Sequence, residues 1–130
     1  MQLSKLNLLV SWPLQLVLAY ILIQAGLEKV QGDQVAIDLF TSLNMEPDGR
    51  MIIGVLECLA AVGLIIPGSN ALAAFLSTGI LLGALIAHIS KIGFEGISYW
   101  AIAFVCSVII VWIRRHQLPF SATRMKNYEK

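Results

Sequence analysis

The chain has 130 residues, of which 58% are hydrophobic and 13% charged, and its formal net charge is +1. Soluble domains carry about 25% charged residues, so this composition, with a mean hydropathy of +0.79, excludes an ordinary water-soluble domain and indicates one membrane domain. The nearly neutral charge leaves no basic excess for a nucleic-acid surface, and we expect no nucleic-acid partner.

Four apolar segments are each long enough to cross about 30 Å of hydrocarbon as a helix. A signal peptide is an alternative for the first, but its apolar run is longer than a signal sequence needs. Trp12-Pro13 could start or kink this helix, Asp48 could cap the second, and Pro67-Gly68 lies in the turn that ends the second. The predicted fold is an all-α transmembrane four-helix bundle, with spans at about 6–27, 48–66, 71–89 and 96–113.

Charge distribution orients these spans. Residues 114–130 carry five basic residues against Glu129 alone, whereas the loop between the first two spans is mainly acidic. The positive-inside rule therefore puts both termini in the cytoplasm and the long loop outside. We expect residues 1–113 to be the transmembrane domain of a bacterial inner-membrane protein and residues 114–130 to be a basic cytoplasmic tail near anionic lipid.

The long loop contains a short amphipathic pattern. Val35, Ala36, Leu39, Phe40 and Leu43 recur at helical spacing within Asp33–Met45. This pattern predicts a helix that Asp33 caps and Pro47 ends, lying on the outer membrane face or over the end of the bundle. Such a helix could be a functional lid or could simply cover the loop backbone.

Glu57 stands alone in the apolar segment 51–66. An acid at this depth must face the protein interior, pair with a cation or bind a proton. The predicted topology brings polar groups from every span to the outer half, whereas the inner half is expected to be nearly all aliphatic apart from Gln15 and Ser77. We therefore predict an outer polar pocket formed by Gln24, Glu28, Lys29, Glu57, His88, Tyr99 and Trp100.

Several of these residues have structural alternatives. Glu57 could pair with Lys29, Arg50 or His88 and only fix the helix register. It could instead act with His88 as a catalytic pair, since imidazole is suited to exchanging a proton with a buried acid. Gln24 could be an interhelical hydrogen-bonding group.

Two other patterns suggest packing. Gly79 and Gly83 form a G-x-x-x-G motif, which we expect to pack against a bundle neighbour or a second copy of the chain. Cys58 and Cys106 lie at similar depths and could form a disulfide, although isolated cysteines in membranes are usually packing residues. No Cys/His spacing indicates a metal site.

In these features the chain resembles the DoxX family of small four-span membrane proteins. The resemblance covers about residues 10–113. It rests on Gly26-Leu27-Glu28-Lys29 (G-x-x-K) at the end of the first span, Gly54-Val55-Leu56-Glu57 (G-x-x-E) in the second, and His88 late in the third. It implies a four-helix membrane bundle whose characteristic positions are Gly26, Lys29, Gly54, Glu57 and His88. Relatives include a subunit of a thiosulfate:quinone oxidoreductase, a membrane partner in thiol and oxidative-stress systems, and assembly factors.

Three functions follow as hypotheses. The first is an accessory or membrane subunit of a quinone- or thiol-linked redox system, in which a pocket around Glu57 and His88 holds a quinone-like molecule. A soluble or membrane partner would then supply the electron-transfer cofactor. The chain would be a subunit of an oxidoreductase rather than a complete enzyme, and it could also form a homo-oligomer. The second is a non-enzymatic scaffold or assembly factor. The third, a proton-coupled exporter, is disfavoured by the charge bias toward one orientation.

Overall fold

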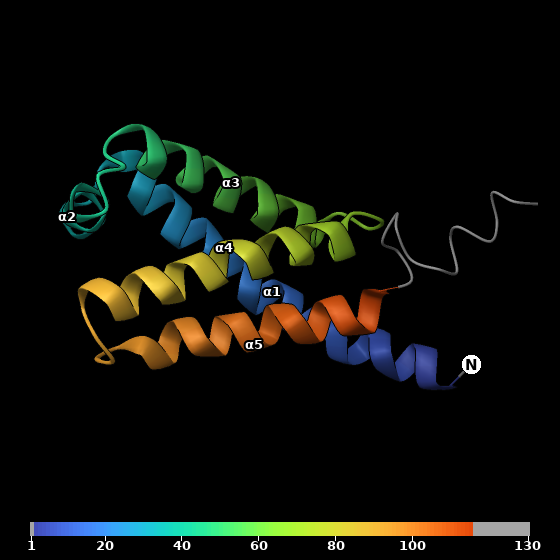
Figure 1. The fold of residues 1–130 in the computed structure, drawn as a ribbon. Coiled ribbons are helices and arrows are strands. Elements are labelled where there is room, and N and C mark those ends of the chain that lie inside the picture. Colours follow the sequence, from blue (N-terminus) through green and yellow to red (C-terminus); the bar gives the residue numbers. More distant parts are fainter. Residues whose placement is uncertain (1, 116–130) are drawn as a thin grey trace, which may run out of the picture.

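The computed structural model describes residues 2–115 and consists of helices joined by short turns (Figure 1). The described residues contain no strand, which confirms the all-α fold class. The predicted tail lies outside the described residues from residue 116 onward. In chain order the helices are α1 (Gln2–Gln31), α2 (Gln34–Ser42), α3 (Asp48–Ile65), α4 (Asn70–Lys91) and α5 (Ile97–Arg114).

The four long helices pack side by side, and the short α2 lies at one end of them (Figure 1). α1 packs most extensively against α3, and α4 packs most extensively against α5. The start of α1 and the end of α5 lie together at the opposite end of the bundle. We call the two ends the α2 end and the terminal end.

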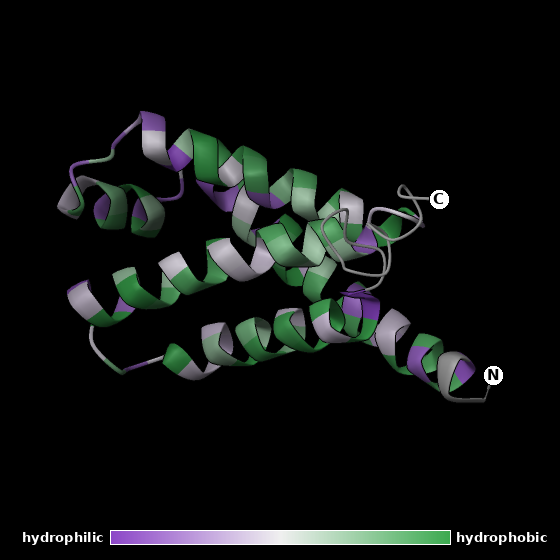
Figure 2. Ribbon diagram, turned by 45° about the vertical axis from the view of Figure 1, so that its right-hand side comes forward, coloured by the Kyte–Doolittle hydropathy of each residue, from purple (hydrophilic) through white to green (hydrophobic). Residues whose placement is uncertain are grey.

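The outside of the bundle is suited to lipid. Many large apolar side chains are exposed on every long helix, while the core is formed by Leu18, Leu22, Leu64, Leu81 and Ile110, each 0% exposed. Hydrophilic residues gather toward the two ends, and the stretch between them is largely hydrophobic (Figure 2). This distribution is typical of a membrane-embedded bundle.

When spans are counted by helix length and composition, their number differs from the predicted four. Three segments are long and apolar enough to cross a membrane: Lys5–Gln31, Asn70–Lys91 and Ile97–Arg114. α3 runs beside them with 18 residues, but it contains three charged residues, Asp48, Arg50 and Glu57. The count by length and composition among the described residues is therefore three rather than four.

α1 is longer than expected and continues through Pro13. A helix start at Ser11-Trp12-Pro13 is therefore wrong. α1 contributes Leu18 and Leu22 to the buried core, so it is an integral part of the bundle.

The helix starts also differ in detail. Asp33 precedes α2 as its N-cap residue, as predicted, but its side chain makes no capping hydrogen bond. Asp48 is the first residue of α3, and the N-cap position belongs to Pro47. At the next turn the Ser69 hydroxyl donates to the Gly63 carbonyl (2.8 Å), which closes the connection from α3 to α4.

The terminal end is more polar than predicted. Gln15 Nε2 and Asn70 Nδ2 both donate to the Leu64 carbonyl, at 2.7 Å and 2.8 Å. Ser11 Oγ donates to the Gln15 side chain and accepts from Arg114 Nε at 3.0 Å. These buried side chains bind one another and tie α1, α4 and α5 to the end of α3, although Arg114 Nη2 has no hydrogen-bond partner among the described residues.

Candidate functional site

The site begins at a close crossing of α1 and α3. A Cβ on Gly26 would lie 2.7 Å from both the Gly54 carbonyl oxygen and Cys58 Sγ, and a Cβ on Gly54 would lie 3.0 Å from the Gly26 carbonyl oxygen. Only residues without a side chain permit this approach. In each helix the charged residue follows the glycine by three positions and so lies on the same face. The crossing therefore brings Lys29 and Glu57 together.

Lys29 and Glu57 form an ion pair inside the bundle. Lys29 Nζ lies 3.0 Å from Glu57 Oε2 and donates a hydrogen bond to Oε1 at 3.2 Å. The Lys29 side chain points back along α1, because Nζ also lies 3.5 Å from the Ala25 carbonyl oxygen. Glu57 is 0% exposed, whereas the Lys29 side chain is 13% exposed. Lys29 is therefore the more accessible member of the pair.

The pair is incompletely satisfied. Glu57 Oε2 is close to the ammonium group but accepts no hydrogen bond of good geometry from any described residue. Lys29 Nζ also lies 5.7 Å from the centre of the Trp100 ring, within the range of a cation–π interaction. A buried carboxylate oxygen without a donor is an acceptor for a ligand or water.

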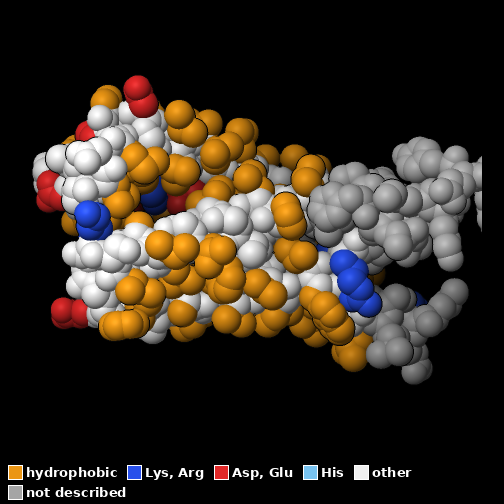
Figure 3. Space-filling model, viewed as in Figure 1, with side chains coloured by type: hydrophobic (Ala, Val, Ile, Leu, Met, Phe, Trp, Pro, Cys, Tyr) orange, Lys and Arg blue, Asp and Glu red, His pale blue; other side chains and the backbone are white. Residues whose placement is uncertain are grey.

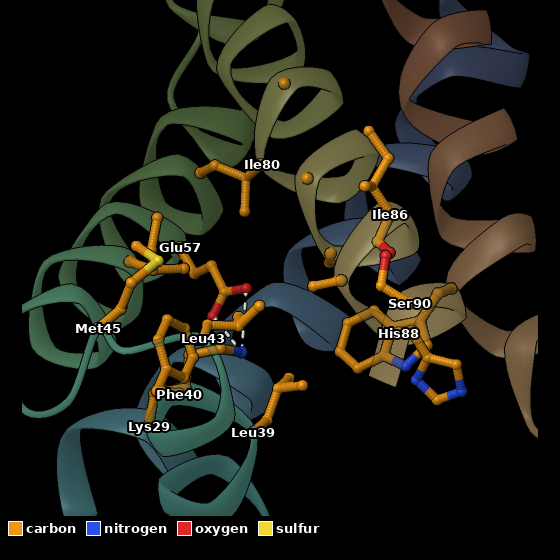
Figure 4. A pocket seen from close by; sticks show the side chains of 16 residues that line it. Lys29, Leu39, Phe40, Leu43, Met45, Glu57, Ile80, Ile86, His88 and Ser90 are labelled. Carbon is orange, nitrogen blue, oxygen red and sulfur yellow. Dashed lines mark hydrogen bonds and ion pairs between the residues drawn. The ribbon is translucent and has the colours of Figure 1, made fainter. Parts of the chain in front are cut away.

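A pocket of about 430 Å³ lies over this ion pair between α2, α3 and α4. In the space-filling view it appears as a hollow between α3 and α4 beside α2, with a basic and an acidic group visible inside (Figure 3). The close-up shows Lys29 and Glu57 joined to each other, with Leu39 and Phe40 of α2 and its C-cap residue Leu43 gathered beside them (Figure 4). The other lining residues include Ile53, Gly79, Ile80, Gly83, Ala84, Ala87, His88 and Trp100. The pocket is thus apolar except at the ion pair and at the α2 end.

α2 covers the pocket at this end and is tethered there. Arg50, near the start of α3, donates from Nε to both carboxylate oxygens of Glu46 at 2.8 Å and 2.9 Å, and from Nη1 to the Lys29 carbonyl oxygen. Phe40 of α2 is only 6% exposed. Arg50 was a candidate partner of Glu57, but it holds the connection after α2 instead.

His88 lines the same pocket on another side. Its Nε2 lies 2.7 Å from the Glu95 carbonyl oxygen, in the turn between α4 and α5. The imidazole lies away from the Glu57 carboxylate in Figure 4. The structure therefore does not pair His88 with Glu57, and His88 holds the turn at the α2 end of the pocket.

Three of the predicted pocket residues lie elsewhere. Gln24 donates to the Tyr20 hydroxyl at 3.0 Å on the exposed side of α1. Glu28 and Tyr99 are exposed as well. Tyr99 contacts Trp100 edge-on, with 5.3 Å between ring centroids. Of the predicted set, the structure gathers Lys29, Glu57, His88 and Trp100 around the pocket and leaves Gln24, Glu28 and Tyr99 outside it.

The structure also tests the Gly79-x-x-x-Gly83 motif and the two cysteines. Cβ atoms placed on Gly79 or Gly83 would meet nothing within 4 Å, so this motif does not pack against a bundle neighbour among the described residues. Both glycines line the pocket instead. Cys58 and Cys106 are free thiols, and Cys58 lies against Gly26 at the crossing of α1 and α3.

Sequence reasoning missed the apolar walls of the site. Leu39, Phe40 and Leu43 belong to the predicted amphipathic helix, and their helical spacing was a usable signal for a face directed at the bundle. The spacing of Gly79 and Gly83 predicted close helix packing, and nothing in it indicated a cavity. No group of three or more His, Cys, Asp or Glu side chains within residues 2–115 is arranged to hold a metal ion.

Fold and site together define an α-helical membrane bundle with a charged pair at the base of an apolar pocket. The DoxX-like family matches residues 13–117, which is most of the chain, and the protein belongs to this family. Neither a curated protein nor a solved structure matches the chain.

Proposed function

We propose that this DoxX-like protein is a membrane subunit of a redox system and binds a quinone-like molecule in the pocket above Lys29 and Glu57. The observation that carries the proposal is the accessible Lys29 ammonium at the base of an otherwise apolar, ligand-sized pocket. Small-molecule pockets are typically about 300–1,000 Å³, mostly apolar, with a few placed polar groups. The pocket of about 430 Å³ has these properties.

The lining suits a flat ring that carries oxygen acceptors. Phe40 and Trp100 supply aromatic surface, which favours offset or edge contacts with another ring. Lys29 is a hydrogen-bond donor with three protons, and it uses one on Glu57 Oε1 and a second, at 3.5 Å, on the Ala25 carbonyl oxygen. Its remaining donor capacity would serve a ring oxygen, and the unpartnered Glu57 Oε2 would accept from a hydroxyl group.

Each residue of the chain then has a distinct role. Lys29 binds the ligand oxygen, and Glu57 neutralises and orients the ammonium group. α2 excludes water from the α2 end of the pocket. A quinone, when bound, would accept electrons and protons and so connect a soluble donor with the membrane pool.

Electrons would come from a partner protein, for instance one that oxidises a thiol or an inorganic sulfur compound. The α2 end lies opposite the start of α1 and the end of α5. With the termini in the cytoplasm of a bacterial inner-membrane protein, as the positive-inside rule favours, the pocket lies on the outer side. The partner would then dock from that side.

Fluorescence of Trp100 tests the binding proposal. Replacing Trp12 and Trp112 with Phe leaves Trp100 as the sole tryptophan of the chain. In lipid nanodiscs, a decyl-substituted benzoquinone should quench this residue saturably, and Lys29→Met should weaken the apparent affinity by about tenfold, the loss of one charge-assisted hydrogen bond. Glu28→Gln, an exposed neighbour, is the control and should bind as the parent does. Quenching that rises linearly without saturation would refute a site.

A second candidate function has its own supporting observation. The Lys29–Glu57 pair is closed and joins two helices at a glycine crossing, as expected of a group that only fixes register in a scaffold or assembly factor. If this is its sole role, affinity purification should recover one stable client protein. Lys29→Met should then release that client in proportion to the lost thermal stability and should leave quinone quenching unchanged. An exporter has no comparable support and stays a hypothesis.

A further inference from the structure

The pocket widens because α3 and α4 separate toward the α2 end. At the terminal end they are in close contact, since a Cβ on Gly63 would lie 2.9 Å from Ala73 Cβ. Further along α4, Cβ atoms on Gly79 and Gly83 would meet nothing within 4 Å. The two helices therefore share a tight contact at one end and an unfilled gap at the other, with the ion pair facing the gap.

The gap lies on the lipid-facing stripe of α4. Leu72, Leu76, Gly79, Gly83 and Ile86 are spaced by three or four residues and so share one side of the helix. Leu72, Leu76 and Ile86 are 53%, 37% and 58% exposed. The glycines are thus an interruption in a row of side chains that face outward, and the pocket opens sideways at that interruption.

The depth of the opening places it in hydrocarbon. α4 is an apolar helix of 22 residues that is long enough to cross a membrane. Gly79 is about 13 Å and Gly83 about 20 Å from the start of this helix, at 1.5 Å per residue. In Figure 3 the hollow faces sideways, perpendicular to the helix axes, and α2 lies across its end. Lipid chains, and not bulk water, would meet this opening.

We propose that the ligand reaches the pocket from the bilayer between α3 and α4, and that a hydrocarbon chain on the bound ligand leaves past Gly79 and Gly83. This inference rests on the proposed function for the ring end of the ligand and adds the ligand class: a ring compound with a long apolar chain. The two glycines determine specificity, because any side chain at these positions would project into the path of the chain.

The test compares one ring with and without its chain in the protein whose only tryptophan is Trp100. The decyl-substituted benzoquinone and the same benzoquinone without the chain are titrated into the parent and into Gly83→Leu. Affinities are expressed per mole fraction of ligand in the nanodisc lipid, which removes the effect of partitioning. We expect Gly83→Leu to weaken the decyl compound by about tenfold, as for overpacking of a fitted site, and the chainless ring by less than about twofold. Leu82→Phe adds bulk to an exposed neighbour that does not line the pocket and should change neither value.

The outcomes separate the two proposals. If the parent binds neither compound, the proposed function fails. If it binds both and Gly83→Leu leaves the decyl compound unchanged, or weakens both compounds equally, the chain path is wrong while the binding site stands.

A second copy of the chain could cover the same glycines, and cross-linking tests this directly. In a background with Cys58→Ala and Cys106→Ala, Gly83→Cys should form no disulfide-linked dimer when copper phenanthroline, an oxidant that enters the bilayer, is added. A dimer in high yield would overturn the lateral opening, because the partner copy would then occupy it.

Discussion

Gly26 and Gly54 lie so close across the crossing of α1 and α3 that a Cβ on Gly26 would come within 2.7 Å of the Gly54 carbonyl oxygen. This contact explains why the two charged residues of the site meet. Each glycine precedes its charged residue by three positions, so the backbone approach at the glycines fixes the separation of Lys29 and Glu57 one turn away. The motifs G-x-x-K and G-x-x-E act as one structural unit formed by two helices.

Gly26→Ala should therefore be destabilising. The added methyl group meets backbone at a distance that cannot relax without moving a helix, and we expect a cost of about 1–3 kcal/mol. Gly79→Ala is the matched control, because its methyl group meets open space and replacing Gly by Ala within a helix stabilises by about 0.5–1 kcal/mol. Thermal unfolding in detergent, followed by circular dichroism, should lower the midpoint for the first variant and not for the second. Equal midpoints would show that the crossing is not tight.

If Lys29 and Glu57 are paired, replacing one of them should destabilise the protein more than replacing both. Lys29→Met removes the cation and leaves a buried carboxylate without a partner, which should cost about 3–5 kcal/mol. Glu57→Gln keeps a polar group beside Lys29 and should cost about 1–3 kcal/mol. Replacing both residues with Met removes both charges together, and because such replacements are often neutral, stability should return to within about 1 kcal/mol of the parent.

The comparison is made by chemical or thermal unfolding of the four proteins in the same detergent. A double variant no more stable than Lys29→Met would contradict the pairing, since removing the Glu57 carboxylate would then relieve no unpaired charge.

The tether of α2 predicts a local effect. Glu46→Gln weakens the two hydrogen bonds from Arg50 Nε and should cost at most about 1 kcal/mol globally, because the pair is partly exposed. The larger effect should be faster amide hydrogen exchange within α2, where Phe40 covers the pocket. Asp38→Asn makes the matched change on α2 itself, where it weakens an exposed hydrogen bond from Gln34 Nε2, and is the control. Unchanged exchange in Glu46→Gln would show that the tether does not hold the helix down.

Much of the fold follows from the sequence, because each span is a long apolar run bounded by turn residues. The short helix before α3 was also predictable from its spacing of apolar residues. The extra polar contacts at the terminal end were not, because Arg114 reaches Ser11 only after α1 and α5 have packed, and Asn70 reaches the Leu64 carbonyl only once the turn from α3 to α4 has formed.

The site was predictable in part. Glu57 was predicted to face the interior, pair or bind a proton, and Lys29, Arg50 and His88 were its candidate partners. Arg50 instead forms a hydrogen-bonded ion pair with Glu46, and His88 Nε2 contacts the Glu95 carbonyl oxygen. The choice of Lys29 depends on the glycine crossing, a contact between segments far apart in the sequence.

The remaining misses have one physical cause. In lipid the outside of a helix is as apolar as its inside, so the amphipathic contrast that orients helices in water is weak. Gln24 and Glu28 share one stripe of α1, yet nothing in that stripe reveals that it faces outward. Likewise the pattern Gly79-x-x-x-Gly83 permits close packing and equally permits an open wall.

The central claim is that the Lys29–Glu57 pair forms the base of a ligand site and does more than fix the packing of α1 against α3. Native mass spectrometry of the purified protein, released gently from detergent, tests it most directly when the parent is compared with the variant in which both residues are Met. Our account predicts a bound apolar ring compound on the parent and none on the double variant, although both are folded. The same ligand occupancy on both proteins would contradict it.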